Sequence, residues 1–417
     1  MATPEPIAIR QLESLRKVIG AVRQGNPFQQ ARLADTGLDE SLDSLETFMA
    51  TCPLTTKDEL CEDQQANPPH GTNLTYPVEH YTRFCRTSGT TGQSLVWLDR
   101  EEDWQWMLSS WETVFRAAGA QSGDSAFFPF SFGPFLGFWA AFEAAQNMGI
   151  LSIPGGGMGS LERMRLIHAQ KVGILCATPT YAIRLGEAAT EGGMKMKNSP
   201  VRKIIVAGEP GGSLPQIRQR IGELWPGATI YDHHGMTEVG PVSYQTDEQP
   251  NLLHVIESAY LAEVLEPEPL ATVPEGQAGE LVLTTLGRMG SPLLRYRTGD
   301  LVKPRHLETG LALEGGILGR VDDMVIIRGV NLHPGAVDAV IRRFPEITEY
   351  QVQVDHVTTL PEISIQIEPM PNAPKDLQQQ VAEALRTQFL LRVPVEAVPP
   401  GSLPRFEMKA RRWQKSI

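Results

Sequence analysis

The stretch RKIIVAGEPGGSLPQIRQRIGELW, residues 202–225, contains one expected β-strand and one expected α-helix, separated by a loop of small residues. Its first part is a short run of β-branched side chains, which is typical of a buried strand. The loop Gly208–Pro210 follows directly, and residues 213–225 carry apolar side chains at helical spacing. We therefore predict the strand–loop–helix unit of an α/β fold.

The same alternation continues on both sides of this unit. The further expected strands are residues 149–156, 172–179 and 228–235, and the expected helices between them are residues 160–170 and 180–191. Strands and helices that take turns form a mostly parallel sheet covered by helices, because each crossover is right-handed. Ligands bind beyond the carboxyl ends of such strands. The loops GEP and HHGMTE are both expected at that edge.

The regions outside this sheet have a different pattern. Residues 9–24 and 101–118 have the apolar spacing of helices, and residues 255–315 are β-rich with turns of Gly, Pro and charged residues. After residue 321 we expect a compact α+β unit, with helices at 334–343 and 375–390 and strands at 349–355, 361–368 and 394–398.

The predicted fold class is therefore α/β. It has a large N-terminal domain at residues 1–321, made of mostly parallel sheets with helices and a small β subdomain at about 255–318. A small, mobile α+β domain at residues 322–417 is expected to follow it.

Composition and charge limit the classes of partner. The chain has 417 residues and a net charge of -12, which argues against nucleic acid as a main partner. The longest apolar region, residues 127–151, is broken by Pro and Gly and contains Glu143, so we do not expect a membrane helix. We expect a soluble cytoplasmic protein, and a homodimer is the common arrangement for such proteins. The basic segment 409–415 is expected to be a solvated end.

The motif TSGTTG, Thr87–Gly92, is a candidate phosphate loop. Glycines let backbone N–H groups turn toward an anion, and hydroxyl groups add uncharged donors, so the motif suits a polyphosphate. It is not a Walker loop, because no Gly-Lys pair follows. The alternative is a polar surface turn.

Two further motifs have the same ambiguity. In YRTGDL, residues 296–301, the aspartate can accept two hydrogen bonds from a ribose diol, but the sequence is also good turn chemistry. In HHGMTE, residues 233–238, the threonine hydroxyl and the adjacent glutamate can serve phosphate and Mg²⁺, and the alternative is a satisfied polar loop.

The last two motifs lie toward the C-terminus. GRVDDMVIIRGVNLHP, residues 319–334, has the paired aspartates of an exposed hinge, and LPRFEMKARRW, residues 403–413, contains Lys409. Each of the five motifs is weak alone. Together, in this order and at these separations, they resemble the adenylate-forming superfamily of acyl- and aryl-CoA ligases, in particular its phenylacetate–CoA ligase branch. The resemblance covers residues from about 50 to 413.

The resemblance implies a two-step reaction with ATP, Mg²⁺ and CoA. A carboxylic acid, ATP and CoA would be the small-molecule partners. The carboxylate attacks the α-phosphate of ATP to give an acyl-adenylate and pyrophosphate. The small domain then rotates, and the thiol of CoA attacks the adenylate.

The resemblance also implies a role for residues that match the motifs of the superfamily. Thr237, Glu238 and Lys409 would be catalytic, with Glu238 binding Mg²⁺, Asp322 acting as the hinge and Gly329 lying beside the CoA tunnel. The ATP- or AMP-binding residues would be Ser88, Gly89, Thr90, Thr91, Gly92, Gly208, Glu209, Pro210, Asp232, His233, His234, Gly235, Met236, Thr237, Asp300 and Arg320. Within this set, Asp232 would contact the adenine amino group, and Asp300 and Arg320 would hold the ribose. The acyl pocket would include Phe132, Phe135 and Gly137, which suit an aryl or arylacetic acid.

Three positions depart from the pattern of the superfamily. His234 stands where a tyrosine usually stacks on adenine, Gln93 stands where the phosphate loop usually has lysine, and Met408 stands where a glycine usually precedes the lysine. These changes favour altered adenine binding and an unusual substrate.

Other interpretations stay open at this point. The acceptor can be CoA, with Arg328, Arg342 and Arg343 near its nucleotide, or another acceptor, as in coenzyme F390 synthetase-like adenylyl transfer or carrier-protein loading. A non-catalytic nucleotide-binding relative is a third class. His233, His234, Asp247 and His254 could bind a metal, although zinc sites prefer tight spacings and a second shell.

Overall fold

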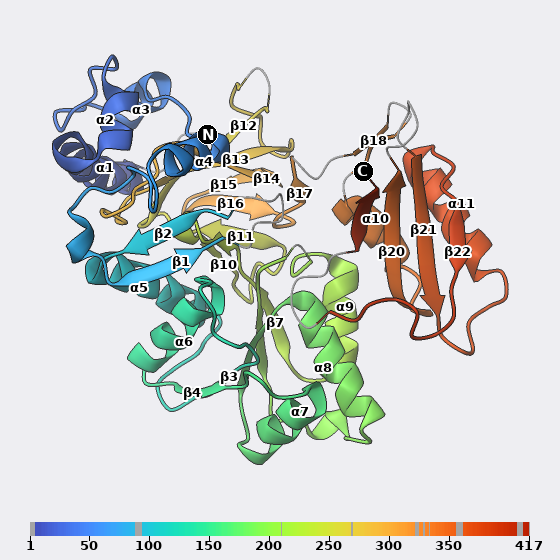
Figure 1. Cartoon of the computed structure of the whole chain (residues 1–417). Coiled ribbons are helices and arrows are strands. Elements are labelled where there is room, and N and C mark those ends of the chain that lie inside the picture. The colour runs from blue at the N-terminus through green and yellow to red at the C-terminus, as the bar shows by residue number, and fades with distance from the viewer. Residues whose placement is uncertain are drawn as a thin grey trace.

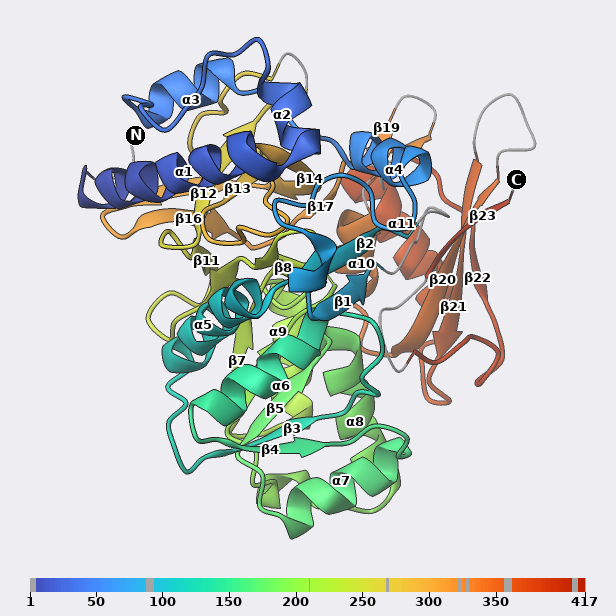
Figure 2. The same ribbon diagram turned by 60° about the vertical axis from the view of Figure 1, so that its left-hand side comes forward.

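The computed structural model describes residues 5–87, 94–209, 211–267, 270–321, 325–327, 330–332, 334–355, 362–406 and 412–416. A large body of sheets and helices is formed by the first three quarters of the chain, and a smaller unit built around one sheet lies beside it (Figure 1, Figure 2). The predicted α/β fold class, with a separate C-terminal α+β unit, is confirmed. The boundary near Asp322 stays a proposal, because residues 322–324 lie outside the described part.

A five-stranded parallel sheet forms the lower part of the body in Figure 1. Its strands, in spatial order, are β4 (Leu151–Pro154), β3 (Ser125–Phe128), β5 (Ile174–Ala177), β6 (Lys203–Val206) and β7 (Thr229–Asp232). Its helices are α6 (Gly137–Asn147), α7 (Ser160–Ala169), α8 (Pro179–Glu191) and α9 (Pro215–Leu224). Every strand and helix predicted between residues 149 and 235 is therefore confirmed, whereas β3 is an additional strand.

Glu143 explains how a charged residue fits into the apolar region 127–151. Its carboxylate accepts hydrogen bonds of 2.7 Å from the indole N–H groups of Trp104 and Trp139. The guanidinium of Arg83 lies 3.3 Å from it. The carboxylate is thus satisfied on the helix α6, and the region runs from the end of β3 through a loop and α6 to the start of β4. Among the described residues, no helix is long and apolar enough to cross a membrane.

Helices at the N-terminus cover one sheet of the body. They are α1 (Glu5–Gly25), α2 (Pro27–Leu33), α3 (Leu45–Thr51) and α4 (Lys57–Ala66), with a short 3-10 turn at η1 (Val78–His80). Leu15, Ile19 and Val22 of α1 are fully buried, so the helix predicted at 9–24 is confirmed. Ile9 is the exception, because 53% of its surface is exposed.

A hairpin and a long helix connect these helices to the parallel sheet. Strands β1 (Arg83–Arg86) and β2 (Val96–Asp99) pair antiparallel, with Arg86 opposite Val96. The predicted phosphate motif lies between these two strands in the sequence, and its residues 88–92 lie outside the described residues. The helix predicted at 101–118 is confirmed as α5 (Glu101–Ala117). A second short 3-10 turn, η2 (Met196–Asn198), follows α8.

The predicted β-rich region forms two four-stranded sheets, with strand orders β10-β11-β16-β15 and β12-β13-β14-β17. Their strands are β10 (Ser243–Tyr244), β11 (Leu252–Val255), β12 (Tyr260–Leu265), β13 (Gly279–Thr285), β14 (Tyr296–Val302), β15 (Pro304–Leu307), β16 (Gly310–Glu314) and β17 (Gly319–Arg320). The small pair β8 (Gly235–Met236) and β9 (Gly240–Pro241) joins the first of these sheets to β7.

The C-terminal unit has a core of its own. Its elements are β18 (Val325–Ile327), β19 (Val330–Leu332), α10 (Pro334–Ile341), β20 (Ile347–Asp355), β21 (Glu362–Pro369), α11 (Leu377–Phe389), β22 (Val395–Ala397) and β23 (Trp413–Ser416). The sheet order is β22-β21-β20-β23, and Leu377, Val381 and Leu385 of α11 are buried against it. The predicted helices and strands of this unit are confirmed.

The basic segment at 409–415 is expected to be a solvated end, and this expectation is wrong for Arg412 and Trp413, whereas Gln414 is exposed. Strand β23 pairs in parallel with β20, with Trp413 opposite Val352. The side chain of Arg412 is only 11% exposed. Strand β23 therefore completes the C-terminal sheet, because its backbone pairs with the free edge of β20 and the preceding Arg412 has a buried partner.

Candidate active site

The loops after β6 and β7 lie at the same edge of the parallel sheet, because Val206 and Asp232 are paired in register. Gly208 has a φ of 94°, a left-handed conformation that favours glycine. The carboxylate of Glu209 accepts a hydrogen bond of 2.8 Å from the backbone N–H of Thr180, in the first turn of α8. The three residues GEP were predicted to flank adenine. In the structure the Glu209 carboxylate binds the N-terminal turn of α8. Pro210 lies outside the described residues.

Asp232 is a buried residue among the predicted nucleotide ligands. Its Oδ2 accepts a hydrogen bond of 2.5 Å from Ser213, and its Oδ1 accepts one of 3.0 Å from the backbone N–H of His233. Burial raises the pKa of the Asp232 carboxyl, although Ser213 and Arg218 oppose the rise. A Cβ atom at Gly212 would lie 2.1 Å from Oδ1, so only glycine fits beside this carboxylate.

His233 is a buried, neutral histidine. A carbonyl oxygen can only accept, so the Nδ1–H group donates the 2.6 Å hydrogen bond to the carbonyl of Ser243. The ring centroid lies 4.2 Å from that of Trp111. Burial lowers the pKa of His233 from 6.5 to about 3, and the neighbouring His234 acts in the same direction. The His233 ring is therefore fixed by its hydrogen bond to Ser243 and by its contact with Trp111.

This burial predicts acid sensitivity. Because the folded-state pKa lies below the ordinary value of 6.5, the unfolded chain binds the proton first as the pH falls. The stabilisation is complete above pH 6.5 and is lost as the pH falls toward 3, by up to about 1.4 kcal/mol per pH unit. We expect His233→Asn to remove about 2 kcal/mol of the stability loss between pH 6.5 and about pH 4.5.

Urea denaturation at several pH values measures this effect. The matched control is His80→Asn, because His80 is exposed at the surface. Equal pH slopes for wild type and His233→Asn would contradict a neutral buried His233.

His234 links the loop after β7 to the β subdomain. Its Nε2 atom lies 2.9 Å from Oδ2 of Asp300. A carboxylate only accepts, so Nε2 carries the hydrogen and Nδ1 is the acceptor of the neutral ring. In the part of the chain that the structure describes, this buried Nδ1 has no partner. The hydrogen bond to Asp300 fixes the plane of the ring, and stacking on adenine stays a prediction.

Asp300 also contacts the second residue predicted to hold ribose. The Nη1 group of Arg320 donates hydrogen bonds of 3.2 Å to Oδ1 of Asp300 and to the carbonyl of Thr298. Arg320 lies directly opposite Asp300 in the pairing of β14 with β17. The structure thus brings together His234, Asp300 and Arg320, three predicted residues from separate segments of the chain.

The motif TGD is a strand with a bulge, and the alternative of a hairpin turn is wrong. The pairing of β13 with β14 shifts register between Glu280 and Val282. Gly299 takes a φ of 75° there, and its N–H donates a hydrogen bond of 3.1 Å to the carboxylate of Glu280. The bulge turns Asp300 toward His234.

Thr237 and Glu238 are held by a buried ion pair that was not predicted. The guanidinium of Arg288 donates hydrogen bonds of 2.9 Å and 2.8 Å to the carbonyl groups of these two residues. It also forms a two-point ion pair with Asp99, at 2.6 Å and 2.8 Å, and both side chains are fully buried. Asp99 ends strand β2 of the phosphate-motif hairpin, so this pair joins that hairpin to the HHGMTE loop.

The Glu238 carboxylate is the predicted Mg²⁺ ligand. Its side chain is 8% exposed, and the ammonium group of Lys57 lies 4.0 Å from its Oε1. No group of three or more His, Cys, Asp or Glu residues in the described ranges could hold a metal by itself.

His254 stacks on Tyr244 at 5.3 Å, and burial lowers its pKa. The histidines around this loop therefore have packing partners.

Several predicted residues cannot be located. Ser88, Gly89, Thr90, Thr91, Gly92 and Gln93 of the phosphate motif lie outside the described residues, as do Asp322, Arg328, Gly329, Met408 and Lys409. Thr87 and Ser94 frame the phosphate motif: the Thr87 hydroxyl accepts a hydrogen bond of 2.9 Å from the N–H of Leu95, and Ser94 donates to the carbonyl of Thr87.

The residues predicted for the acyl pocket lie before and at the start of α6. Phe132 and Phe135 are 40% and 44% exposed, and Gly137 is the first residue of the helix. Phe132 lines a surface pocket of about 370 Å³ with Trp139 and Phe142. Phe135 is not among the residues that line this pocket, and an acyl-binding role stays a prediction for all three residues.

Comparison with known proteins places this site in a family. The family model "AMP-binding enzyme" matches residues 55–290, and the model "AMP-binding enzyme C-terminal domain" matches residues 329–415. The phenylacetate-coenzyme A ligase of Thermus thermophilus is 29% identical, over 97% of this chain and 95% of its own length. The Escherichia coli protein of the same name is 29% identical, over 86% of this chain and 83% of its own.

Solved structures agree with this assignment. A crystal structure of 2-hydroxyisobutyryl-CoA ligase in the postadenylation state is 27% identical, covers 97% of this chain and 89% of its own, and has a TM-score of 0.88. The same ligase in the thioesterification state is 28% identical, with coverage of 97% and 88% and a TM-score of 0.72. The arrangement of the two units here is therefore more similar to the postadenylation state.

The chain belongs to the family of AMP-binding enzymes, since the family model matches more than half of it. Within that family its enzyme class is that of the AMP-forming, adenylate-forming CoA ligases, as predicted. The use of ATP and CoA fits this class.

Proposed function

We propose that the protein activates an aryl or arylacetic acid with ATP and then transfers the acyl group to CoA. In the first step a carboxylate oxygen forms a bond to the α-phosphorus, and pyrophosphate leaves. In the second step the thiol sulfur of CoA forms a bond to the acyl carbon, and AMP leaves. The observation that supports this best is the joining of Asp300, Arg320 and His234 at one site beside the Thr237–Glu238 loop.

We propose that this arrangement binds the nucleotide. The Asp300 carboxylate has the chemistry to accept hydrogen bonds from a ribose diol, and Arg320 and His234 orient it from two sides. The Thr237 hydroxyl would contact the α-phosphate. Fixed groups of this kind stabilise charge in the transition state because they need no rearrangement when the charge develops.

Mg²⁺ would be held by Glu238 in this proposal. A single carboxylate together with phosphate oxygens is a donor set that Mg²⁺ commonly accepts. When bound, the ion neutralises part of the phosphate charge. The role of this chain is to hold the carboxylate in place, which it does through the contacts of Arg288 to the backbone of Glu238.

Lys409 would supply the positive charge for adenylation, with Asp322 as the hinge and Gly329 beside the path of CoA. These roles rest on matching motifs. Since the second step needs a different arrangement of the two units, Lys409 would act in the first step only.

An acid with a ring is supported by the aromatic residues around Phe132. Its ring lies 5.1 Å from that of Phe142, and the neighbouring Phe130 and Phe138 rings stack at 4.5 Å. Aromatic surfaces of this kind favour planar apolar groups. The curated relatives that match most of the chain are also named as phenylacetate ligases.

ATP–pyrophosphate exchange tests this proposal. The panel contains benzoate, phenylacetate, 2-hydroxyisobutyrate and medium-chain fatty acids, and each acid is run with wild type and with Lys409→Ala. We expect exchange with an aryl or arylacetic acid, and a loss of about a hundredfold or more in the variant. AMP release that depends on CoA then identifies the acceptor.

Three outcomes would contradict the proposal. Exchange with fatty acids alone would reject the aryl class, and no exchange with any acid, despite ATP binding, would reject adenylation. Exchange without CoA-dependent AMP release would reject CoA as the acceptor.

A further inference from the structure

Two buried glutamates lie directly opposite each other in the C-terminal sheet. Glu349 of β20 and Glu368 of β21 are paired in register, next to a shift in the pairing between Ile347 and Glu349. Their residues are 4% and 1% exposed. Like charges in facing positions of neighbouring strands are destabilising, so each carboxylate needs a cation of its own.

Glu368 finds its cation in the segment that follows β22. Both of its carboxylate oxygens accept hydrogen bonds from the guanidinium of Arg405, one of them at 3.1 Å. The backbone N–H groups of Gly401 and Leu403 donate to the same carboxylate, at 2.8 Å and 3.2 Å. Burial alone would raise the pKa of Glu368, but Arg405 and these two N–H groups lower it to about 2. Glu368 therefore stays charged and fixes the path of residues 401–405.

Glu349 finds its cation at the other end of the same segment. Arg412 donates hydrogen bonds of 2.6 Å and 3.2 Å to its two oxygens. The guanidinium also lies 5.2 Å from the ring centroid of Tyr350, and the carbonyl of Arg412 accepts a hydrogen bond of 2.7 Å from Val352. This end is thereby held by side chain, ring and backbone together.

The two ends also touch each other. The guanidinium of Arg412 lies 5.7 Å from the ring centroid of Phe406. Lys409 is midway between Phe406 and Arg412 in the sequence. Two adjacent positions of one sheet thus fix Arg405 and Arg412, two described residues that flank Lys409 in the sequence.

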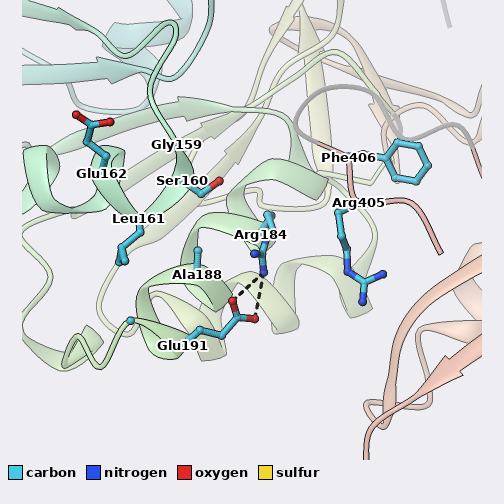
Figure 3. A pocket seen from close by; sticks show the side chains of 10 residues that line it. Gly159, Ser160, Leu161, Glu162, Arg184, Ala188, Glu191, Arg405 and Phe406 are labelled. Carbon is cyan, nitrogen blue, oxygen red and sulfur yellow. Dashed lines mark hydrogen bonds and ion pairs between the residues drawn. The ribbon is translucent and has the colours of Figure 1, made fainter. Parts of the chain in front are cut away.

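The first of these ends faces the N-terminal body. Arg405 and Phe406 form one side of a pocket of about 560 Å³, and residues of α7 and α8, among them Arg184 and Glu191, form the other side (Figure 3). Arg184 and Glu191 are paired with each other at 3.1 Å. The segment before Lys409 is therefore held at the junction of the two units.

We propose that Glu349 and Glu368 are positioning residues for Lys409. Each fixes one end of the segment that contains this lysine, through an arginine of that segment. The inference rests on the proposed function in one respect, since it takes Lys409 to act in adenylation.

Half-reactions with Glu368→Gln and Glu349→Gln test this inference. The first step is measured by ATP–pyrophosphate exchange with the acid that gives the highest wild-type rate. The second is measured as thioester formation from the synthetic acyl-adenylate of that acid with CoA. We expect exchange to fall about tenfold to a hundredfold, because small misplacements of a catalytic group cost that much. Thioester formation should stay near the wild-type rate, which a general loss of folding would not allow.

Matched variants separate positioning from stability. Glu383→Gln removes the Glu383–Arg386 ion pair, in which both side chains are more than half exposed, and should change neither step. Arg405→Gln removes the other partner of the Glu368 ion pair, and the Arg405 side chain is the more exposed of the two. It should reproduce the effect of Glu368→Gln. Equal losses in both half-reactions, or wild-type exchange in both glutamate variants, would overturn the inference.

The same variants distinguish a failure of the proposed function. If Lys409→Ala leaves exchange unchanged, the proposed role of Lys409 in adenylation is wrong. The proposal that Glu349 and Glu368 position Lys409 for that step is then also wrong. Limited trypsin digestion of the full chain needs no substrate. It tests separately whether the two glutamates hold the segment that contains Lys409. Cleavage after Lys409 should be faster in Glu349→Gln and Glu368→Gln than in wild type and Glu383→Gln. Equal cleavage rates would overturn the proposal that the glutamates hold this segment, even if no acid substrate were identified.

Discussion

Replacing Arg288 with methionine is expected to lower the free energy of unfolding by about 3–5 kcal/mol, because it leaves the buried Asp99 carboxylate without its partner. Both side chains of the pair are fully buried. Asp99 raises the pKa of Arg288 despite the opposing effect of burial, so the pair is charged. The variant also removes the donor for the carbonyl groups of Thr237 and Glu238. Urea denaturation followed by tryptophan fluorescence measures the loss, since Trp97 lies 5.0 Å from the guanidinium.

Two controls make this result specific. Asp99→Leu combined with Arg288→Met removes both charges and should recover a large part of the lost stability. Arg116→Met breaks an ion pair with Glu112 in which the arginine is 61% exposed, and should cost less than about 1 kcal/mol. If the double variant were less stable than Arg288→Met, the uncompensated carboxylate would not be the cause.

Replacing Asp300 with asparagine is expected to weaken ATP binding by about 10- to 150-fold. Each hydrogen bond to a charged group contributes about 1.5–3 kcal/mol, and asparagine keeps the size of the side chain while removing its charge. Arg320 would lose its ion pair at 3.2 Å, and His234 would lose an acceptor of full charge. Isothermal titration with ATP measures the affinity, and pyrophosphate exchange measures the first step.

Glu263→Gln is the stability-matched control for this variant. Glu263 is a largely buried carboxylate of strand β12 in the same sheet, and it pairs with Arg295 at 2.9 Å. Its loss should reduce stability without changing ATP affinity. Asp300→Asn with wild-type ATP affinity and reduced stability would mean that Asp300 only links the two loops.

The order of the elements was predictable from the sequence because each element has a local pattern. The strand and the helix of residues 202–225 were recognised from β-branched residues and helical spacing, and both are present as β6 and α9. β3 was missed because its four residues, SAFF, run into an apolar stretch interrupted by Pro and Gly. The basic segment around Arg412 was misjudged because its charges gave no sign of a buried partner.

The contacts that organise the site were not predictable, because they join distant residues. Arg288 and Asp99 are separated by 189 positions, and neither lies in a recognised motif. Glu349 and Glu368 face each other only once the register of β20 and β21 is known. The position of Asp300 depends on a bulge at Gly299, which the motif TGD does not distinguish from a turn. Motifs predict which residues belong to the site, and tertiary pairing determines where they lie.

The Arg288–Asp99 pair has a consequence for the entropy of nucleotide binding. It joins the end of strand β2 to the loop of Thr237 and Glu238, so these described residues are held together before any ligand arrives. Ordering a free side chain on binding costs about 0.5–1.5 kcal/mol, and a flexible backbone costs about 1–2 kcal/mol per residue. If ATP binds at the Thr237–Glu238 loop as proposed, this loop is already ordered during folding, and more of the interaction energy remains to hold ATP.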